Sequence, residues 1–374
     1  MNFCIITHVP HGRNKSSYFA YAPYVKEMNI WLDYVDTVSI VAPLTLGGIS
    51  EITEEYKRKS IHFIKVKSFN FLTFKSSLLS VVGMPFLCYT IFKAMKNADH
   101  IHLRCPGNMG LIGSVIQIFF PNTPKTAKYA GNWDPKSKQP LSYVIQKWIL
   151  SSTFLTRNIK VLVYGEWEYQ SNNITSFFTA SYREEDKESI QTREFDGLKT
   201  FFFIGTLSPG KQPIYALQII NELHNSGESV ELFIYGDGAE KGKIEKYIHE
   251  NKLDKIVFLK GNQSQDIIKR ELQRGHFLIL PSKSEGWPKV IAEAMFWGCF
   301  PIATDVSCVK SMFDNGERGL LLTMDITNDI AAILALLKDP ATYNQTTLNA
   351  LNWSRKYTLN FFENEVKSLL TIKK

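Results

Sequence analysis

Two segments of this sequence begin in the same way, with a short apolar strand, a polar loop and a helix. Residues 2–7 (NFCIIT) precede the loop HVPHGRNKSS and a helix-like stretch over 18–31. Residues 200–205 (TFFFIG) precede the loop TLSPGKQP and a helical stretch over 214–224. Strands that alternate with helices are typical of a parallel sheet covered by helices. The sequence therefore predicts an α/β fold that starts twice.

The alternation continues after each start. Further apolar strands are expected at 38–43, 62–66, 100–104, 161–165, 231–236, 256–261, 277–281 and 300–304, and further helices at 240–251, 266–273, 288–297 and 329–338. Strands that are almost entirely apolar suit a sheet with both faces covered. A chain of 374 residues allows two domains of roughly 100–200 residues each. We therefore expect two doubly wound domains in tandem.

The domain boundary is expected in residues 181–197, which are charged and poor in aliphatic side chains. This places an N-terminal domain at 1–190 and a C-terminal domain at 198–345. The last residues, 346–374, read as an amphipathic terminal helix that packs back on the N-terminal domain.

The densest group of candidate functional residues is PSKSEGWPKVIAEAMFWG, residues 281–298, which follows a strand and enters a helix. Pro288 suits the first helical turn, where its missing N–H costs nothing. Glu285 before the helix and Glu293 within it can reach one crevice at the carboxyl ends of the strands, where open α/β sheets bind ligands. Helix N–H groups can hold a diphosphate, and carboxylates can accept hydrogen bonds from sugar and ribose hydroxyls. In the alternative interpretation, Glu285 caps the helix and Glu293 is exposed.

A second candidate is the loop GTLSPGKQ, residues 205–212, which differs from a Walker A loop by one residue. Gln212 stands where that motif needs a magnesium-binding hydroxyl, and Pro209 removes an N–H from a cradle that works through N–H groups. Both differences argue against a nucleoside-triphosphatase loop. Lys211 is still a cation directly after a strand, placed to pair with a diphosphate; the alternative is a solvent-exposed lysine in a tight turn.

The glycines of YGDGAEKG, at 236, 238 and 242, do not match the dinucleotide pattern G-x-G-x-x-G. We expect a tight turn after a strand, where Gly236 and Gly238 allow a ligand to approach the backbone.

In the first half, polar residues gather in loops that follow strands. His8, His11 and Gly12 follow the first strand, and Arg104 ends a strand that also contains His100 and His102. Two histidines without a third ligand at a suitable spacing do not predict a metal site, and His102 reads as a satisfied strand histidine. Asn132 and Trp133 lie in the loop KYAGNWDPK, where both side chains can contact a sugar.

Charge is distributed unevenly around a net value of +7. No acidic residue lies between Glu55 and Asp99, although this stretch contains eight basic residues: Lys57, Arg58, Lys59, Lys65, Lys67, Lys75, Lys93 and Lys96. Such a block suits anionic lipid headgroups or a phosphate-bearing acceptor; the alternative is a solvated face with a chance bias. No zinc, helix-turn-helix or RNP pattern accompanies it, so nucleic acid is not an expected partner.

The five cysteines include no C-x-x-C pair and suit reduced, buried thiols of a cytosolic protein. No signal peptide is expected at the N-terminus. The longest charge-free apolar stretch, 76–92, is shorter than the about 20 residues that a membrane-spanning helix needs. We therefore expect a cytoplasmic protein, with peripheral attachment to an anionic inner-membrane surface through residues 57–96.

With these residues identified, the chain resembles the family 4 retaining glycosyltransferases of the GT-B fold. The family pattern E-G-(F/W)-(G/P)-x-V-x-x-E-A-M-x-x-G is matched by Glu285, Gly286, Trp287, Pro288, Val290, Glu293, Ala294, Met295 and Gly298. The pattern G-(R)-L-S-P-x-K is matched by Gly205, Leu207, Ser208, Pro209 and Lys211, and G-D-G by Gly236–Gly238. Thr206 departs from this pattern, because many members have arginine there. The resemblance is strong over 200–340 and extends at the level of the fold to the residues before.

The resemblance implies two Rossmann-like domains that face each other across a cleft, the first binding the acceptor and the second the nucleotide-sugar donor. It implies that Glu285 faces the donor sugar, Glu293 the ribose and Lys211 the diphosphate. The implied catalytic residues are Glu285, Lys211 and Arg104, the last replacing a histidine that many members carry. The implied donor-binding residues are Gly205, Thr206, Gly236, Gly238, Gly286, Trp287, Pro288, Lys289, Val290 and Glu293. On the acceptor side we expect His11, Gly12, Asn132 and Trp133.

The implied reaction transfers a hexose-type sugar from a UDP- or GDP-sugar to a glycan or lipid-linked acceptor, with retention at the anomeric carbon. It would belong to the biosynthesis of a cell-surface polysaccharide: capsule, exopolysaccharide or lipopolysaccharide. Neither a metal nor another cofactor is expected, in line with the absence of a D-x-D sequence. The alternatives are a catalytically silent subunit that binds sugar or nucleotide, and a nucleotide-sugar epimerase of the same fold.

Overall fold

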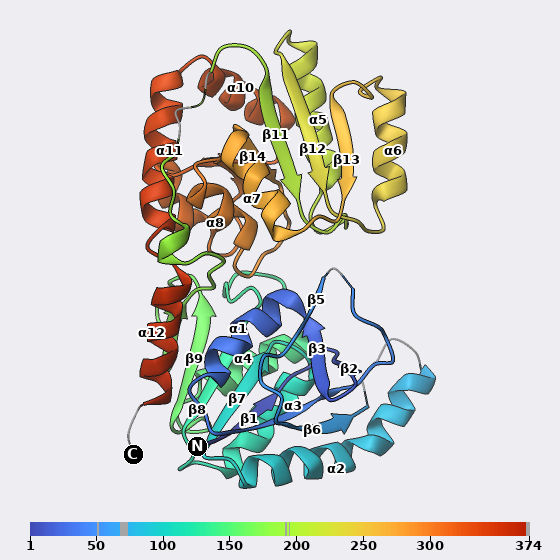
Figure 1. The fold of residues 1–374 in the computed structure, drawn as a ribbon, viewed down its shortest axis with the longest axis vertical. Coiled ribbons are helices and arrows are strands. Elements are labelled where there is room, and N and C mark those ends of the chain that lie inside the picture. The colour runs from blue at the N-terminus through green and yellow to red at the C-terminus, as the bar shows by residue number, and fades with distance from the viewer. Residues whose placement is uncertain (51, 68–73, 191–192, 194, 372–374) are drawn as a thin grey trace. The chain divides into compact units, whose positions relative to one another are not determined.

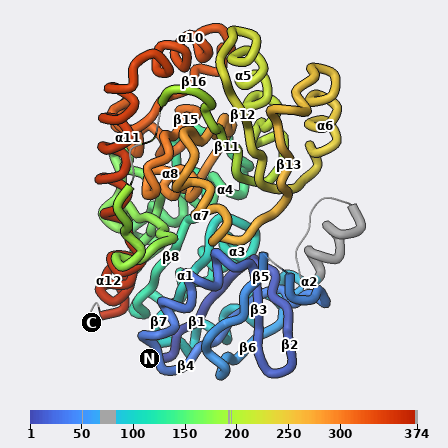
Figure 2. The backbone as a smooth tube through the Cα atoms, turned by 45° about the horizontal axis from the view of Figure 1, so that its top comes forward, coloured from blue at the N-terminus to red at the C-terminus, as the bar shows by residue number. Residues whose placement is uncertain are grey.

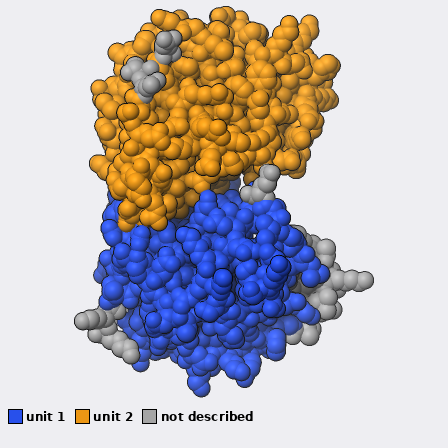
Figure 3. All heavy atoms as spheres, viewed as in Figure 1, with its two compact units in different colours: residues 1–178, 361–374 blue, residues 179–360 orange. Residues whose placement is uncertain are grey.

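The computed structural model describes the chain except residues 51, 68–73, 191–192, 194 and 372–374, and the side chains of 74–82. It contains two compact units (Figure 3): unit 1 is Met1–Phe178 with Phe361–Lys374, and unit 2 is Thr179–Asn360. The boundary between the two units, at Phe178 and Thr179, thus lies just before the expected linker at 181–197. The expected terminal segment 346–374 is divided, because only its residues from Phe361 onward belong to unit 1.

Unit 1 is built on a seven-stranded parallel sheet in the order β10-β9-β8-β7-β1-β4-β6 (Figure 1). In chain order its strands are β1 (Asn2–Ile6), β4 (Thr37–Pro43), β6 (Ile61–Val66), β7 (His100–Cys105), β8 (Lys125–Tyr129), β9 (Ile159–Tyr164) and β10 (Ile174–Phe177). The winding reverses between β1 and β7, as in doubly wound folds, which bind ligands at that point.

The helices of unit 1 are α1 (Ala22–Leu32), α2 (Phe74–Lys96), α3 (Asn108–Ile116), the 3₁₀ turn η1 (Gln117–Phe119), α4 (Leu141–Ser151) and most of α12 (Leu359–Leu370). A small antiparallel sheet of β2 (Gly12–Asn14), β3 (Ser17–Tyr21) and β5 (Thr53–Glu55) lies beside the main one. The predicted helix start at residue 18 is wrong. Residues 17–21 form β3, and α1 begins only at Ala22, with proline in its first turn.

Strand β8 was not among the predicted strands, and the loop predicted at 128–136 begins on its last two residues. All five of its residues are nevertheless buried. Lys125 Nζ donates to the carbonyl oxygen of Phe120 at 2.5 Å, and Lys128 Nζ to that of Phe178 at 2.8 Å. These partners allow two ammonium groups to lie inside a parallel sheet.

Unit 2 is built on a six-stranded parallel sheet in the order β13-β12-β11-β14-β15-β16, the doubly wound order of a dinucleotide-binding fold. Its strands are β11 (Lys199–Ile204), β12 (Val230–Tyr235), β13 (Val257–Gly261), β14 (Phe277–Leu280), β15 (Phe300–Thr304) and β16 (Leu320–Leu322). The winding reverses between β11 and β14, the strands that precede the two candidate donor loops.

The path of the backbone through unit 2 can be followed in Figure 2, from β11 to the helices after β16. The helices are α5 (Pro213–Asn225), α6 (Lys241–Glu250), α7 (Gln265–Arg274), α8 (Lys289–Phe296), α9 (Val309–Phe313), α10 (Ile326–Leu337) and α11 (Pro340–Ser354), with 3₁₀ turns η2 (Glu184–Asp186) and η3 (Asp314–Gly316). Both units are Rossmann-like, which confirms the predicted pair of doubly wound α/β domains. Within the described residues, no helix has the length and apolarity to cross a bilayer.

Candidate functional site

The loops after β11 and β14 meet at the point where the sheet of unit 2 reverses its winding. The backbone N–H of Lys283 donates to the carbonyl oxygen of Gly210 at 2.8 Å. The side-chain amide of Gln212 donates to the carbonyl oxygen of Pro281 at 2.6 Å. Gln212, which stands at the hydroxyl position of a Walker A motif, therefore connects the two candidate loops. These bonds bring the segments 205–212 and 281–285 into one site.

Lys211 and Glu285, both predicted to be catalytic, form an ion pair in this site. Lys211 Nζ lies 2.5 Å from Glu285 Oε1. The Glu285 side chain is 8% exposed and that of Lys211 28%, so the carboxylate is buried while the ammonium still reaches solvent. A buried carboxylate needs such a partner. The structure therefore brings together the cation expected at the diphosphate and the carboxylate expected at the sugar.

The backbone between Glu285 and α8 is held by the loop after β15. The carbonyl oxygen of Gly286 accepts hydrogen bonds from Ser307 Oγ at 3.1 Å and from Cys308 Sγ at 3.2 Å. Pro288 caps α8, which begins at Lys289. The first N–H groups of a helix have no helical acceptor, so Lys289 and Val290 offer two donors beside the fixed loop. This arrangement suits an anionic group.

Gly236 and Gly238 are required by close packing of the backbone. A Cβ atom on Gly236 would lie 1.9 Å from the carbonyl oxygen of Gly205, and one on Gly238 would lie 2.4 Å from that of Leu207. Both glycines also have positive φ, 142° and 157°. They therefore allow the turn after β12 to pack on the loop after β11, a reason different from the ligand approach that the sequence suggested.

Glu293 and Trp287 lie on either side of the start of α8. The hydroxyl of Ser181 donates to Glu293 Oε1, so this half-buried carboxylate already has a partner. The ring of Trp287 stacks on Trp353 at 6.2 Å between ring centroids and meets Tyr357 edge-on at 5.8 Å. The Trp287 ring thus packs with residues of α11 and beyond, which gives it a structural role that the family pattern did not indicate.

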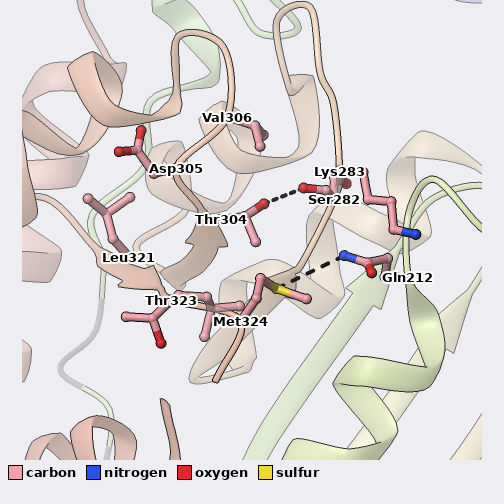
Figure 4. Close-up of a pocket in the computed structure, with 10 residues that line it drawn as sticks. Gln212, Ser282, Lys283, Thr304, Asp305, Val306, Leu321, Thr323 and Met324 are labelled. Carbon is pink, nitrogen blue, oxygen red and sulfur yellow. Dashed lines mark hydrogen bonds between the residues drawn. The ribbon is translucent and has the colours of Figure 1, made fainter. Parts of the chain in front are cut away.

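A cavity of about 680 Å³ lies at the carboxyl ends of β14, β15 and β16 (Figure 4). It is lined by Gln212, Ser282, Lys283, Thr304, Asp305, Val306, Leu321, Leu322, Thr323 and Met324. Lys283 was not among the predicted site residues, although it stands two residues before Glu285. Its exposed side chain and the bond of its N–H to Gly210 place a second cation beside the Lys211 loop. The sequence PSKSEG did contain a signal for this second cation, because it has a lysine in the same loop as Glu285.

The corresponding point in unit 1 lies between the ends of β1 and β7. A Cβ atom on Gly107 would lie 3.0 Å from Nδ1 of His8, so the two loops are in contact there. Loss of water contacts and the nearby Arg104 guanidinium lower the pKa of His8, although a hydrogen bond to the Arg104 backbone opposes the shift. His8 was noted only as a loop residue. The position of His8 directly after the first strand could have identified it as a candidate site residue.

Arg104 is held by a buried ionic network in unit 1. Its Nη1 lies 2.6 Å from Glu27 Oε1, and Lys128 Nζ lies 3.7 Å from Glu27 Oε2. Its guanidinium lies over the ring of Tyr24, 5.4 Å from the centroid. Burial alone would lower the pKa of Arg104, but the Glu27 carboxylate and neighbouring tyrosines raise it above its ordinary value. Arg104 therefore has a structural partner, and its catalytic role stays a prediction.

Three of the four expected acceptor-side residues are buried parts of the unit 1 framework. His11 is 0% exposed, and its ring nitrogens hydrogen-bond to the Val9 carbonyl and the Tyr56 hydroxyl, each at 2.8 Å. A Cβ atom on Gly12 would lie 2.0 Å from the Phe19 ring. These contacts argue against the acceptor contacts expected of His11 and Gly12.

The third buried residue is Trp133, which is 3% exposed and donates from Nε1 to Gln170 Oε1 at 2.9 Å. This placement also argues against a role for Trp133 at the acceptor. Asn132 is half-buried, and its Oδ1 accepts from the Asp134 N–H at 2.9 Å. Across the part of the chain that is described, no three His, Cys, Asp or Glu side chains gather as a metal site would require.

Comparison with known proteins gives a family match that includes both loops of this site. Residues 184–353, which cover unit 2 apart from its ends, match the model of the family described as group 1 glycosyl transferases. The alpha-D-kanosaminyltransferase of Streptomyces kanamyceticus is 28% identical over 160 residues, which are 42% of this chain and 42% of that protein. The poly(ribitol-phosphate) alpha-N-acetylglucosaminyltransferase of Staphylococcus aureus is 26% identical over 258 residues, 66% of this chain and 50% of that protein. The matched part thus spans half or less of these curated relatives.

Among solved structures, the Anabaena protein Alr3699/HepE in complex with UDP and glucose superposes with a TM-score of 0.71 at 12% identity, covering 99% of each chain. This likeness extends over both units and concerns the fold. The chain therefore has the GT-B fold, and its residues 184–353 carry the pattern of the group 1 glycosyl transferases.

Proposed function

We propose that this protein is a glycosyltransferase that moves a hexose-type sugar from a UDP- or GDP-sugar to a glycan or lipid-linked acceptor, with retention at the anomeric carbon. The observation that carries the proposal is the Lys211–Glu285 pair at the reversal point of unit 2, beside the start of α8. A cation and helix N–H groups suit a diphosphate, and a carboxylate suits sugar hydroxyls.

The chemistry follows from charge. When the bond between sugar and diphosphate breaks, negative charge develops on the departing phosphate. Lys211, Lys283 and the first N–H groups of α8 supply preorganised positive charge for it. Glu285 positions the sugar by accepting hydrogen bonds from its hydroxyls. No metal ion has a step in this proposal.

Retention is part of the proposal, with attack by the acceptor on the same face of the sugar from which the diphosphate departs. The two relatives have "alpha" in their names, and an α-product from an α-configured nucleotide sugar requires retention. We place the reaction in the cytoplasm, in the assembly of a cell-surface polymer. The relative that acts on poly(ribitol-phosphate) supports a polymeric, phosphate-bearing acceptor.

A panel of UDP- and GDP-hexoses tests the proposal, with release of nucleoside diphosphate measured in the presence and absence of lipid and glycan acceptors. Acceptor-dependent release that Glu285→Ala abolishes would support the proposal. Product from the donor alone would favour the epimerase alternative. Tight nucleotide binding without turnover would favour a silent binding subunit, an alternative kept open because Lys211 and Arg104 are each paired within the protein.

A further inference from the structure

Helix α4 of unit 1 presents its apolar side to solvent. Leu141 is 74% exposed, Val144 49%, Ile145 42% and Trp148 66%. Val144 and Ile145 each lie three or four positions from both Leu141 and Trp148, so the four side chains form one stripe of the helix. The polar side chain of Gln146, in contrast, is 0% exposed. Surface helices ordinarily bury their apolar stripe, and a contiguous exposed one marks an interaction site.

The neighbouring elements extend this stripe. On α2, Phe86 is 73% exposed and Tyr89 63%. The ring of Phe92 contacts Phe119 of η1 at 6.3 Å between centroids, and Phe119 is 68% exposed.

Phe154, just after α4, is also 74% exposed. Gln117 Nε2 of η1 donates to the Leu155 carbonyl at 3.2 Å, so η1 lies beside the segment that follows α4. In unit 1, α3 contacts both α2 and α4 and thereby connects them. We call this surface the apolar face; it consists of Phe86, Tyr89, Phe92, Phe119, Leu141, Val144, Ile145, Trp148 and Phe154.

The charge around the apolar face is predominantly positive. From Tyr56 to Gly165 the sequence has 16 lysines and arginines but only two acidic residues, Asp99 and Asp134. Exposed cations near residues of the apolar face in the sequence are Lys93 and Lys96, which follow Phe92, and Arg157 and Lys160, which follow Phe154. The guanidinium of Arg157 lies over the Phe154 ring, 5.3 Å from its centroid.

We propose that the apolar face docks on the surface of an anionic lipid membrane. Tryptophan, tyrosine and phenylalanine suit the boundary between headgroups and acyl chains, while lysine and arginine reach the lipid phosphates. A second copy of the chain fits less well, because a two-fold interface would bring the same cations face to face. The surface centres on α4 and shares with the basic stretch 57–96 only its last eleven residues, 86–96.

Binding to vesicles tests this docking surface, and it needs neither donor nor acceptor, so the result is independent of the proposed activity. The full chain is sedimented with vesicles of phosphatidylcholine alone or of phosphatidylcholine with phosphatidylglycerol. We expect Trp148→Ser with Phe154→Ser to weaken binding to the anionic vesicles about tenfold or more. Tyr169→Ser, which removes a 101% exposed aromatic of unit 1 outside the apolar face, should leave binding unchanged.

A second pair of variants tests which exposed cations contribute to binding of the anionic vesicles. Arg157→Gln with Lys160→Gln should weaken binding to anionic vesicles severalfold, and more so at low salt. Lys57→Gln with Lys59→Gln, which removes two exposed cations far from α4 in the sequence, should have the smaller effect. Because all these side chains are exposed, thermal unfolding should stay unchanged.

The proposal is overturned if the Trp148 and Phe154 variant binds anionic vesicles as the wild type does, or if the wild type does not bind them. A dimer in light scattering that the same variant dissociates, without vesicle binding, would assign the apolar face to a second copy.

Discussion

The ammonium of Lys211 and the carboxylate of Glu285 neutralise each other across 2.5 Å, although the two residues come from different loops. A donor diphosphate would compete with Glu285 for this ammonium, because both partners are anions. Glu285 would then be free to accept hydrogen bonds from the sugar. An exchange of partners on donor binding is therefore a consequence of this ion pair, and it can be measured.

Replacement of Glu285 by glutamine keeps the shape of the side chain and removes its charge. We expect turnover to fall about a hundredfold, the order found when one preorganised polar contact is lost. The affinity for UDP or GDP should rise severalfold, because Lys211 loses its competing anion. Steady-state kinetics and calorimetric titration with the nucleoside diphosphate measure the two effects. Glu250→Gln, at an exposed carboxylate of α6, is the control. Unchanged turnover would remove Glu285 from the reaction.

Lys211→Met should weaken nucleoside diphosphate binding about tenfold to a hundredfold, equivalent to about 1.4–2.8 kcal/mol. It should also lower the free energy of unfolding by about 1–3 kcal/mol, because Glu285 is left buried without its cation. The double variant Lys211→Met with Glu285→Gln separates these effects. We expect it to recover stability in chemical denaturation but not nucleotide affinity. Recovery of both would show that Lys211 serves the fold alone.

Lys283 provides a test of the second cation in the donor site. We expect Lys283→Gln to weaken nucleoside diphosphate binding about threefold to tenfold and to reduce its dependence on salt, as removal of one exposed charge does. Lys255→Gln, at an exposed lysine elsewhere in unit 2, should have no effect. Calorimetric titrations at two ionic strengths give both quantities. An equal loss of nucleoside diphosphate affinity in the two variants would show that the affinity depends on the overall charge of the protein and not on the position of Lys283.

The strongest predictions from the sequence came from apolar strands and from residues directly after them. The strands β11 and β14 were expected, and Glu285 and Glu293 were assigned to one crevice because parallel strands end at a common edge. The family resemblance then added Lys211 to the same donor site. Strand β8 was missed, and the acceptor of its buried Lys128 is the Phe178 carbonyl, 50 residues away, which no local pattern encodes. Similarly, buried His11 has a hydrogen-bond partner far along the chain, the hydroxyl of Tyr56, which is 45 residues away. Partners of this kind are defined only by the tertiary structure.

The buried histidines of unit 1 lead to a prediction about acid. Burial lowers the pKa of His11 to about 4, although a hydrogen bond to the Val9 carbonyl opposes it. Burial and the nearby Lys125 lower the pKa of His100 to about 4. Burial, and then the Arg104 charge, holds the pKa of His102 well below its usual range.

These histidines stay neutral in the folded protein, while in the unfolded chain they gain a proton below about pH 6.5. Their contribution to stability is therefore present above pH 6.5 and is lost as the pH falls towards 4. Each of His11 and His100 should cost about 2 kcal/mol of unfolding free energy between pH 7 and pH 4.5. Carboxylates also titrate in this range, so the effect is taken as a difference between variants.

His100→Asn keeps a polar side chain for the hydroxyl of Thr126, which now lies 3.0 Å from His100 Nε2. We expect this variant to be less stable than the wild type at pH 7, because it packs less well on Phe3. The difference should shrink by about 2 kcal/mol at pH 4.5, where the wild type bears the cost of its buried histidine. His249→Asn, at an exposed histidine of unit 2, is the control and should follow the wild type at both pH values. Denaturant unfolding curves for the three proteins provide the comparison. A difference for His100→Asn that stays constant with pH would show that His100 takes up a proton equally in both states.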